Sequence, residues 1–100
     1  LELAETYLRA ALAADPGYSP ALVQLADVTY ERGNYLQSRA FLERYMSATP
    51  SSAAALWLGV RVENALGDAQ AASTYAARLK KEFPEAKETG LLLEQERDAG

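Results

Sequence analysis

The chain of 100 residues contains no cysteine and no histidine. Without cysteine it can form no disulfide, no thiolate metal site and no thiol nucleophile, and thiol chemistry says nothing about its compartment. Without histidine it lacks the commonest general base and a frequent metal ligand. Its six serines have no partner base in evident reach. We therefore expect no enzyme, no cofactor, no metal site and no small-molecule substrate. We place four acidic residues on solvated faces or caps: Glu43, Glu63, Asp68 and Glu82.

Long apolar runs and clusters of basic residues are also missing. No apolar run approaches the roughly 18 residues that a membrane-spanning helix needs. Ten basic residues are scattered along a chain of net charge −4, which disfavours nucleic acid as a partner. Residues 1–9 have a helical pattern rather than that of a signal peptide, so we expect the sequence to begin inside a longer protein.

What the chain does contain is a period of 34 residues. Pro16, Pro50 and Pro84 are 34 residues apart, and Gly33 and Gly67 are separated by the same interval. A fixed period of this length is typical of stacked repeats, in which each unit buries its apolar face against a neighbour. Alanine is abundant and β-branched residues are few, which favours helices over strands.

Apolar spacing and turn residues predict six helices. We expect Ser19 to cap the second helix, Asn34 with Gln37 to form a capping box, Ser51 or Ser52 to cap the fourth helix, and Asp68 to cap the fifth. Gly33 and Gly67 are expected to close helices in the left-handed conformation. The predicted helices cover approximately residues 1–14, 19–32, 34–48, 52–66, 68–82 and 85–97.

The 34-residue pattern resembles the tetratricopeptide repeat. Its second-helix positions fall on Ala4, Leu8, Ala11 and Pro16, then Ser38, Leu42, Tyr45 and Pro50, then Ala72, Ala76, Leu79 and Pro84. Its first-helix positions fall on Leu22, Leu25, Ala26 and Thr29, then Leu56, Gly59, Val60 and Glu63.

The resemblance implies an all-α fold, a right-handed superhelical stack of antiparallel helix hairpins. We expect a single domain over 1–100, with the second helix of a truncated repeat (1–18), two repeats (19–52 and 53–86) and a capping helix (87–100) whose Leu91, Leu92 and Leu93 cover the preceding pair.

A narrower resemblance covers roughly residues 33–88. The stretch Leu56-Trp57-Leu58-Gly59-Val60-Arg61, the turn Leu66-Gly67-Asp68 and the end Leu79-Lys80-Lys81-Glu82-Phe83-Pro84 are similar to the type IV pilus biogenesis and stability lipoproteins of the PilF/PilW family. This resemblance implies a pilotin, a lipid-anchored protein on the periplasmic side of the outer membrane. Its partner would be the secretin subunit or another pilus-assembly component, and its lipid-bearing cysteine would lie upstream of Leu1.

In a stack of this kind, the first helices of successive repeats line the concave side. Residues 34 apart should then be neighbours, which predicts a partner-binding patch of one tryptophan, one tyrosine and charged, amide and apolar residues. The predicted patch comprises Val23, Asp27, Tyr30, Trp57, Arg61, Asn64 and Leu91.

Several of these residues have an alternative role in packing. Trp57 either fills the seam between helices or is a partly exposed anchor, and Asp27 and Arg61 either pair with each other or with a partner. We assign five tyrosines to packing between helices: Tyr7, Tyr18, Tyr35, Tyr45 and Tyr75.

Two further functions stay open at this point. The chain could be a general tetratricopeptide adaptor that binds a peptide or helix of a soluble partner unrelated to pili, or a regulatory appendage of an enzyme. A lipoprotein signal upstream of Leu1 would favour the pilotin, and a cytosolic start would favour the adaptor.

Overall fold

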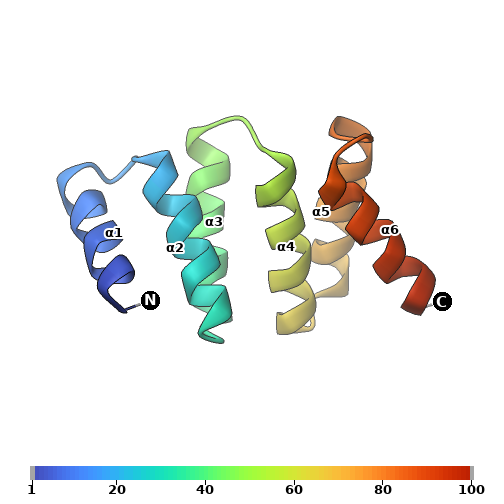
Figure 1. The fold of residues 1–100 in the computed structure, drawn as a ribbon, viewed down its shortest axis with the longest axis horizontal. Coiled ribbons are helices and arrows are strands. Elements are labelled where there is room, and N and C mark those ends of the chain that lie inside the picture. Colours follow the sequence, from blue (N-terminus) through green and yellow to red (C-terminus); the bar gives the residue numbers. More distant parts are fainter. Residues whose placement is uncertain (1, 100) are drawn as a thin grey trace. The chain divides into compact units, whose positions relative to one another are not determined.

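The computed structural model describes residues 2–99, which form six helices and no strand. They divide into two compact units, residues 1–50 and residues 51–100. The first unit contains α1 (Glu2–Ala14), α2 (Ser19–Glu31) and α3 (Tyr35–Ala48), and the second contains α4 (Ala53–Leu66), α5 (Ala69–Glu82) and α6 (Lys87–Ala99) (Figure 1). The all-α prediction is thereby confirmed. Among these helices, none is long and apolar enough to cross a membrane.

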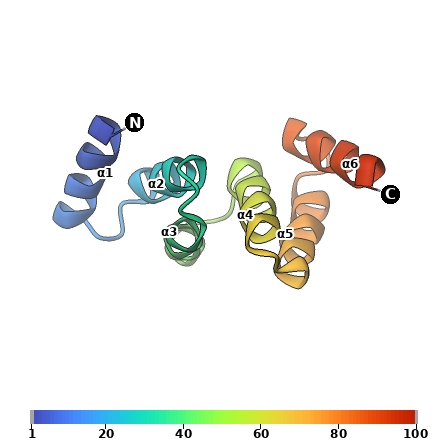
Figure 2. The same cartoon turned by 90° about the horizontal axis from the view of Figure 1, so that it is seen from below.

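In the first unit, α2 packs against α3 as a hairpin and α1 packs against α2, as both views show (Figures 1 and 2). The core is a cluster of buried residues from α1 and α2, against which half-buried side chains of α1 and α3 pack. Its members are Leu12, Ala21, Leu22 and Leu25, and the packed neighbours are Leu8, Ala11, Phe41 and Tyr45.

The hairpin α2–α3 closes at Gly33, whose φ of 80° lies in the left-handed region that glycine adopts without strain. The amide of Gly33 donates to the carbonyl of Tyr30, and the amide of Asn34 donates to that of Thr29. Farther along, the Ser38 hydroxyl donates to the Ala26 carbonyl at 2.5 Å. Ser38 of α3 and Ala26 of α2 are both small, which lets the two helices approach closely.

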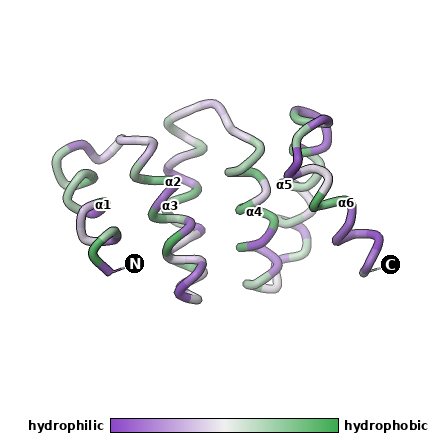
Figure 3. The backbone as a smooth tube through the Cα atoms, in the orientation of Figure 1, coloured by the Kyte–Doolittle hydropathy of each residue, from purple (hydrophilic) through white to green (hydrophobic). Residues whose placement is uncertain are grey.

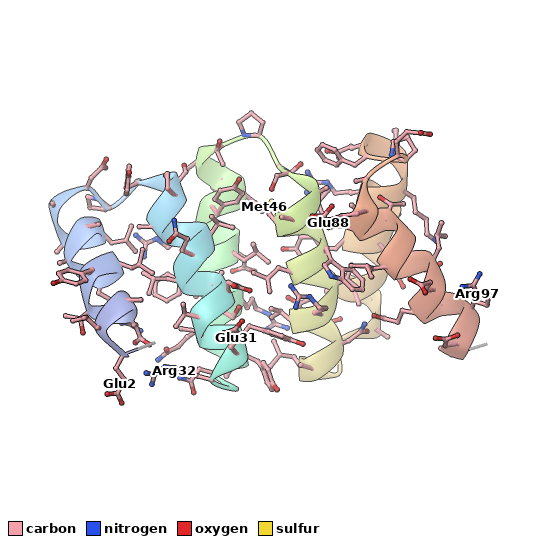
Figure 4. The ribbon with its side chains drawn as sticks, viewed as in Figure 1. Glu2, Glu31, Arg32, Met46, Glu88 and Arg97 are labelled. Carbon is pink, nitrogen blue, oxygen red and sulfur yellow. The ribbon has the colours of Figure 1, made fainter. Side chains whose placement is uncertain are left out.

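Ion pairs join α1 to the end of α2 around Glu5. Its two carboxylate oxygens lie 2.9 Å from Arg9 Nε and 3.2 Å from Arg32 Nε. Arg32 Nη2 also lies 3.9 Å from a carboxylate oxygen of Glu2, beside which it appears in Figure 4. These side chains are at least partly solvated, so we expect each pair to contribute about 0 to 1 kcal/mol.

In the second unit, α4 and α5 form a hairpin that closes at Gly67 with a φ of 77°, and α6 packs on both helices. Asp68 Oδ1 accepts from the Ala71 amide at 3.0 Å, and Ser52 Oγ accepts from the Ala55 amide at 3.2 Å. Both predicted caps are therefore confirmed. The C-terminal half of α6 is predominantly hydrophilic (Figure 3). The largest fully buried apolar side chains of this unit are Leu56, Val60, Val62, Leu79 and Leu92. Val60 and Leu58 are each 2% exposed.

The predicted cap at Ser19 and the predicted capping box of Asn34 with Gln37 are wrong, although Asn34 does hold the cap position of α3. Ser19 is the first residue of α2, and Tyr18 holds the cap position without a side-chain hydrogen bond. Asn34 caps α3 with no side-chain bond either, and the amide oxygen of Gln37 accepts from Arg9 at 3.4 Å. Gln37 thus contacts α1 instead of closing a capping box.

The last helix begins at Lys87, two residues later than predicted, because residues 84–86 form a turn. The Thr89 hydroxyl donates to the carbonyl of Phe83, and the Ala86 amide donates to the same carbonyl. The predicted division into one domain with repeats at 19–52 and 53–86 stays a prediction.

A hydrogen-bonded network at the start of the second unit joins Ser51 to the end of α5. Arg78 Nη2 donates to Ser51 Oγ at 2.8 Å, and Ser51 Oγ donates to Glu82 Oε1 at 3.0 Å. Arg78 Nε completes the network at 3.1 Å from Glu82 Oε2. The Arg78 bond, followed by the Ser51 bond, holds the pKa of Glu82 below its ordinary value of 4.5.

The lowered pKa of Glu82 predicts a pH dependence of stability. A carboxyl group whose pKa is lower in the folded protein stabilises the fold above its ordinary pKa and loses that contribution as the pH falls through the lowered value. Glu82→Gln should therefore make the free energy of unfolding fall less steeply between about pH 5 and pH 3. Urea titrations at several pH values measure this slope. Ser51→Ala should give an intermediate slope, and a wild-type slope in Glu82→Gln would contradict the assignment.

Candidate functional site

The first part of the predicted patch lies on one face of α2. Val23, Asp27 and Tyr30 are spaced four and three residues apart, which places them on the same side of a helix. Val23 and Tyr30 are half-buried and Asp27 is exposed. The residues that α2 buries are different ones: Ala21, Leu22, Leu25, Ala26 and Thr29. Asp27 is thus the most accessible of the three, and Val23 and Tyr30 are accessible in part.

The ring of Tyr30 packs beside that of Tyr35. Their centroids are 5.5 Å apart and their planes are tilted by 52°, a favourable arrangement for two aromatic rings. The turn at Gly33 produces this contact because it joins the last turn of α2 to the first turn of α3. Tyr35 packs as predicted, and it also steadies Tyr30, a role that the sequence analysis did not assign to it.

The second part of the patch lies on α4. The guanidinium carbon of Arg61 is 5.6 Å from the centre of the Trp57 ring, which is a cation–π contact across one helical turn. Both side chains are half-buried, and Asn64, one turn farther on, is exposed. Trp57 is therefore a partly exposed aromatic residue whose orientation is restrained by Arg61, as an interface anchor requires.

Leu91, the predicted contribution of α6, is 46% exposed. Of the three consecutive leucines only Leu92 covers the preceding hairpin, since it is 1% exposed whereas Leu93 is 50% exposed. The prediction that all three are packed is wrong, because consecutive residues of a helix point in different directions and only one can face α4 and α5.

A cavity of about 200 Å³ lies among α4, α5 and α6 in the second unit. Asn64 of α4 and Gln95 of α6 both line it, so the structure brings a predicted patch residue together with an amide of α6. Leu91 is not among the lining residues. An ion pair joins α5 to α6 near this cavity, with Lys80 Nζ 2.8 Å from Glu96 Oε1. Glu96 also lines the cavity.

Three residues differ from their predicted environment. Glu63, expected on a solvated face, is 3% exposed because it continues the buried stripe of Leu56 and Val60 on α4. Tyr7 and Tyr18, expected to pack, are 68% and 47% exposed. Tyr7 lies on α1, at a position that the packing of this helix against α2 leaves uncovered, and Tyr18 lies in the loop before α2. Tyr35, Tyr45 and Tyr75 are half-buried, in agreement with packing.

Among residues 2–99, no group of three or more carboxylates is placed to hold a metal ion. The faces of α2 and α4 belong to different units. Their predicted alignment along one groove stays a prediction.

Comparison with known proteins gives a matching family model and several similar structures, among them those of PilW and PilF. The family model described as tetratricopeptide repeat matches residues 1–58. PilW, a widely conserved type IV pilus biogenesis factor, has a TM-score of 0.84 at 36% sequence identity, over 92% of this chain and 42% of PilW. PilF of Pseudomonas aeruginosa has a TM-score of 0.83 at 21% identity, over 91% of this chain and 41% of PilF, which is a likeness of fold alone. The chain spans less than half the length of either protein. A comparison with curated proteins found no match.

Proposed function

The chain belongs to the tetratricopeptide repeat family, whose fold is a scaffold for contacts between proteins, and from this premise we propose that it is part of a pilotin-type factor. Such a factor would help the secretin of a type IV pilus to reach the outer membrane and assemble there. The observation that carries this proposal is the likeness to PilW, which extends over 92% of the chain at 36% identity. The PilW likeness agrees with the resemblance of the Leu56–Arg61 stretch to the same family and extends it to 92% of the chain.

The location that follows is the periplasmic side of the outer membrane. The lipid anchor would be attached to a cysteine upstream of Leu1, since the chain itself contains none. The upstream sequence tests this part directly. A lipoprotein signal ending in a cysteine supports it, and a cytosolic start would favour a general adaptor for a soluble partner.

We propose that the faces described above make the contacts with the partner. On α2 these are Val23, Asp27 and Tyr30, and on α4 they are Trp57, Arg61 and Asn64, with Leu91 on α6. Trp57 and Arg61 have the strongest physical support, because tryptophan and arginine dominate interface energetics and here they restrain each other.

The function is tested by deleting the gene in its bacterium and following the heat-stable secretin multimers by gel electrophoresis. We expect the multimers to be lost and to return when the full-length gene is supplied. Unchanged multimers in the deletion strain would reject the pilotin role.

The site is tested with the double variant Trp57→Ala, Arg61→Glu. It should weaken capture of the secretin by about tenfold or more, since loss of a central anchor usually costs more than 1 kcal/mol. The matched control is Leu93→Ala, Arg97→Glu, which makes the same kinds of change one turn apart on exposed residues of α6. Both should retain helical circular dichroism. Equal capture by both variants and the wild type would reject the site but not the pilotin role.

A further inference from the structure

A second surface of the first unit is a groove between the loop after α1 and the C-terminal half of α3. Its volume is about 530 Å³, within the usual range for sites that bind small groups. Leu22, 1% exposed, closes its floor. Its other lining residues are Pro16, Gly17, Ala40, Glu43, Arg44, Ser47 and Ala48. Val23, Asp27 and Tyr30 do not line it, so this surface is separate from the one described on α2.

Hydrogen bonds within the loop after α1 stabilise the wall that this loop forms. The Tyr18 amide donates to the Asp15 carbonyl at 3.0 Å, and the Gly17 amide donates to Asp15 Oδ1 at 3.3 Å. Gly17 adds no side chain, and a Cβ atom there would meet only Asp15 Oδ1, at 3.9 Å. The opening is thus kept free by glycine on one side and by alanines of α3 on the other.

Arg44 lies at the edge of this groove, exposed and oriented by two contacts. Its Nη2 donates to the Pro16 carbonyl at 2.7 Å, and its guanidinium carbon is 6.0 Å from the centre of the Phe41 ring. Arg9 and Arg32, the other arginines near α1, are paired with glutamates, whereas Arg44 has no carboxylate partner among residues 2–99. Because one bond already orients its planar group, binding a carboxylate would cost little side-chain entropy.

We propose that this groove binds a segment of a partner protein in which an apolar side chain is followed by an acidic residue. The apolar side chain enters between Pro16 and Ala48, and the carboxylate pairs with Arg44. Glu43 also lines the groove and repels a carboxylate, so the acidic residue is directed to the Arg44 side. A lipid headgroup fits less well, because anionic membranes are recognised by clusters of about four to eight basic residues and the chain has a net charge of −4.

The test is a titration of the isotope-labelled chain with the peptide acetyl-Ser-Leu-Asp-Ser-amide, followed by nuclear magnetic resonance. We expect the amide signals of Gly17, Ala40 and Ala48 to shift. The matched peptide with asparagine in place of aspartate should bind about tenfold more weakly, since it cannot form the charge-assisted bond.

Two variants distinguish the groove from other surfaces. Arg44→Gln should abolish the preference for the aspartate peptide, and Ala40→Trp should abolish binding by filling the groove. Both are first checked for wild-type circular dichroism. The proposal is overturned if no signals shift, if the shifts map to other helices, or if Arg44→Gln keeps the preference. Sedimentation with phosphatidylglycerol vesicles that depends on Arg44 would also overturn it, in favour of a headgroup site. None of these results depends on whether the protein is a pilotin.

Discussion

Replacement of Leu25 by alanine should lower the free energy of unfolding by about 2 to 5 kcal/mol, the usual cost of truncating a buried leucine. Leu25 is 0% exposed and belongs to the cluster that joins α1 and α2. Phe41 and Tyr45 of α3 pack against the same cluster, so the cavity left by the truncation would touch all three helices of the first unit. The cost should approach the upper end of the range if these rings do not move into the space.

The matched control for this substitution is Leu36→Ala. Leu36 lies on α3 and is 67% exposed, so its truncation removes the same atoms from a solvated position. Its effect should stay within about 0.5 kcal/mol. Urea denaturation followed by circular dichroism measures both. Similar losses for the two variants would mean that Leu25 is not a core residue.

The predictable parts of the fold were those decided by the local backbone. Gly33 and Gly67 take the left-handed conformation that ends α2 and α4, and the prolines at positions 16, 50 and 84 lie in the loops after α1, α3 and α5. Asp68 and Ser52 form their caps within three residues of the chain. The cap at Ser19 failed because α2 begins one residue earlier than predicted, and the capping box of Asn34 failed because Gln37 is bonded elsewhere. Gln37, for example, contacts Arg9, which is 28 residues away in the sequence.

In the candidate site, too, contacts within one helix could be predicted from the sequence, whereas burial by other helices could not. The Trp57 and Arg61 contact was accessible to prediction because both residues lie on one helix, four positions apart. The burial of Glu63 and the exposure of Tyr7 were not, because they depend on which other helices cover α4 and α1. The groove at Arg44 had no signal in the sequence at all, since it depends on the approach of the loop at Pro16 to α3.

Gly59 shows how the two hairpins solve the same packing problem differently. It occupies the place of Leu25, 34 residues earlier, where the tetratricopeptide pattern has leucine. An ideal Cβ atom on Gly59 would lie 2.8 Å from the Tyr75 ring, so the ring fills the space that a side chain would need. The first hairpin holds both Leu25 and an aromatic residue, Phe41, at the two equivalent positions, whereas in the second hairpin the Tyr75 ring takes the volume beside α4 that a leucine side chain would need.

Gly59→Ala should accordingly destabilise the protein by up to about 2 kcal/mol, although alanine is the better helix former. Strain from overpacking usually costs about 1 to 3 kcal/mol, against a helix gain of about 1 kcal/mol. The matched control is Gly90→Ala on α6, where a Cβ atom would have no neighbour within 4 Å. This control should stabilise the protein by up to about 1 kcal/mol. Urea denaturation should thus separate two glycine-to-alanine changes by about 2 kcal/mol in opposite directions.

The Tyr75 ring is the stated cause of this strain, and a double-mutant cycle isolates its part. Tyr75→Ala will itself destabilise the hairpin by removing a half-buried ring. In that background Gly59→Ala should become neutral or stabilising, because the new methyl group then enters free space and the helix gain remains. A penalty of the same size with and without the ring would show that the strain arises elsewhere in α4, and the assignment of the strain to the Tyr75 ring would have to be abandoned.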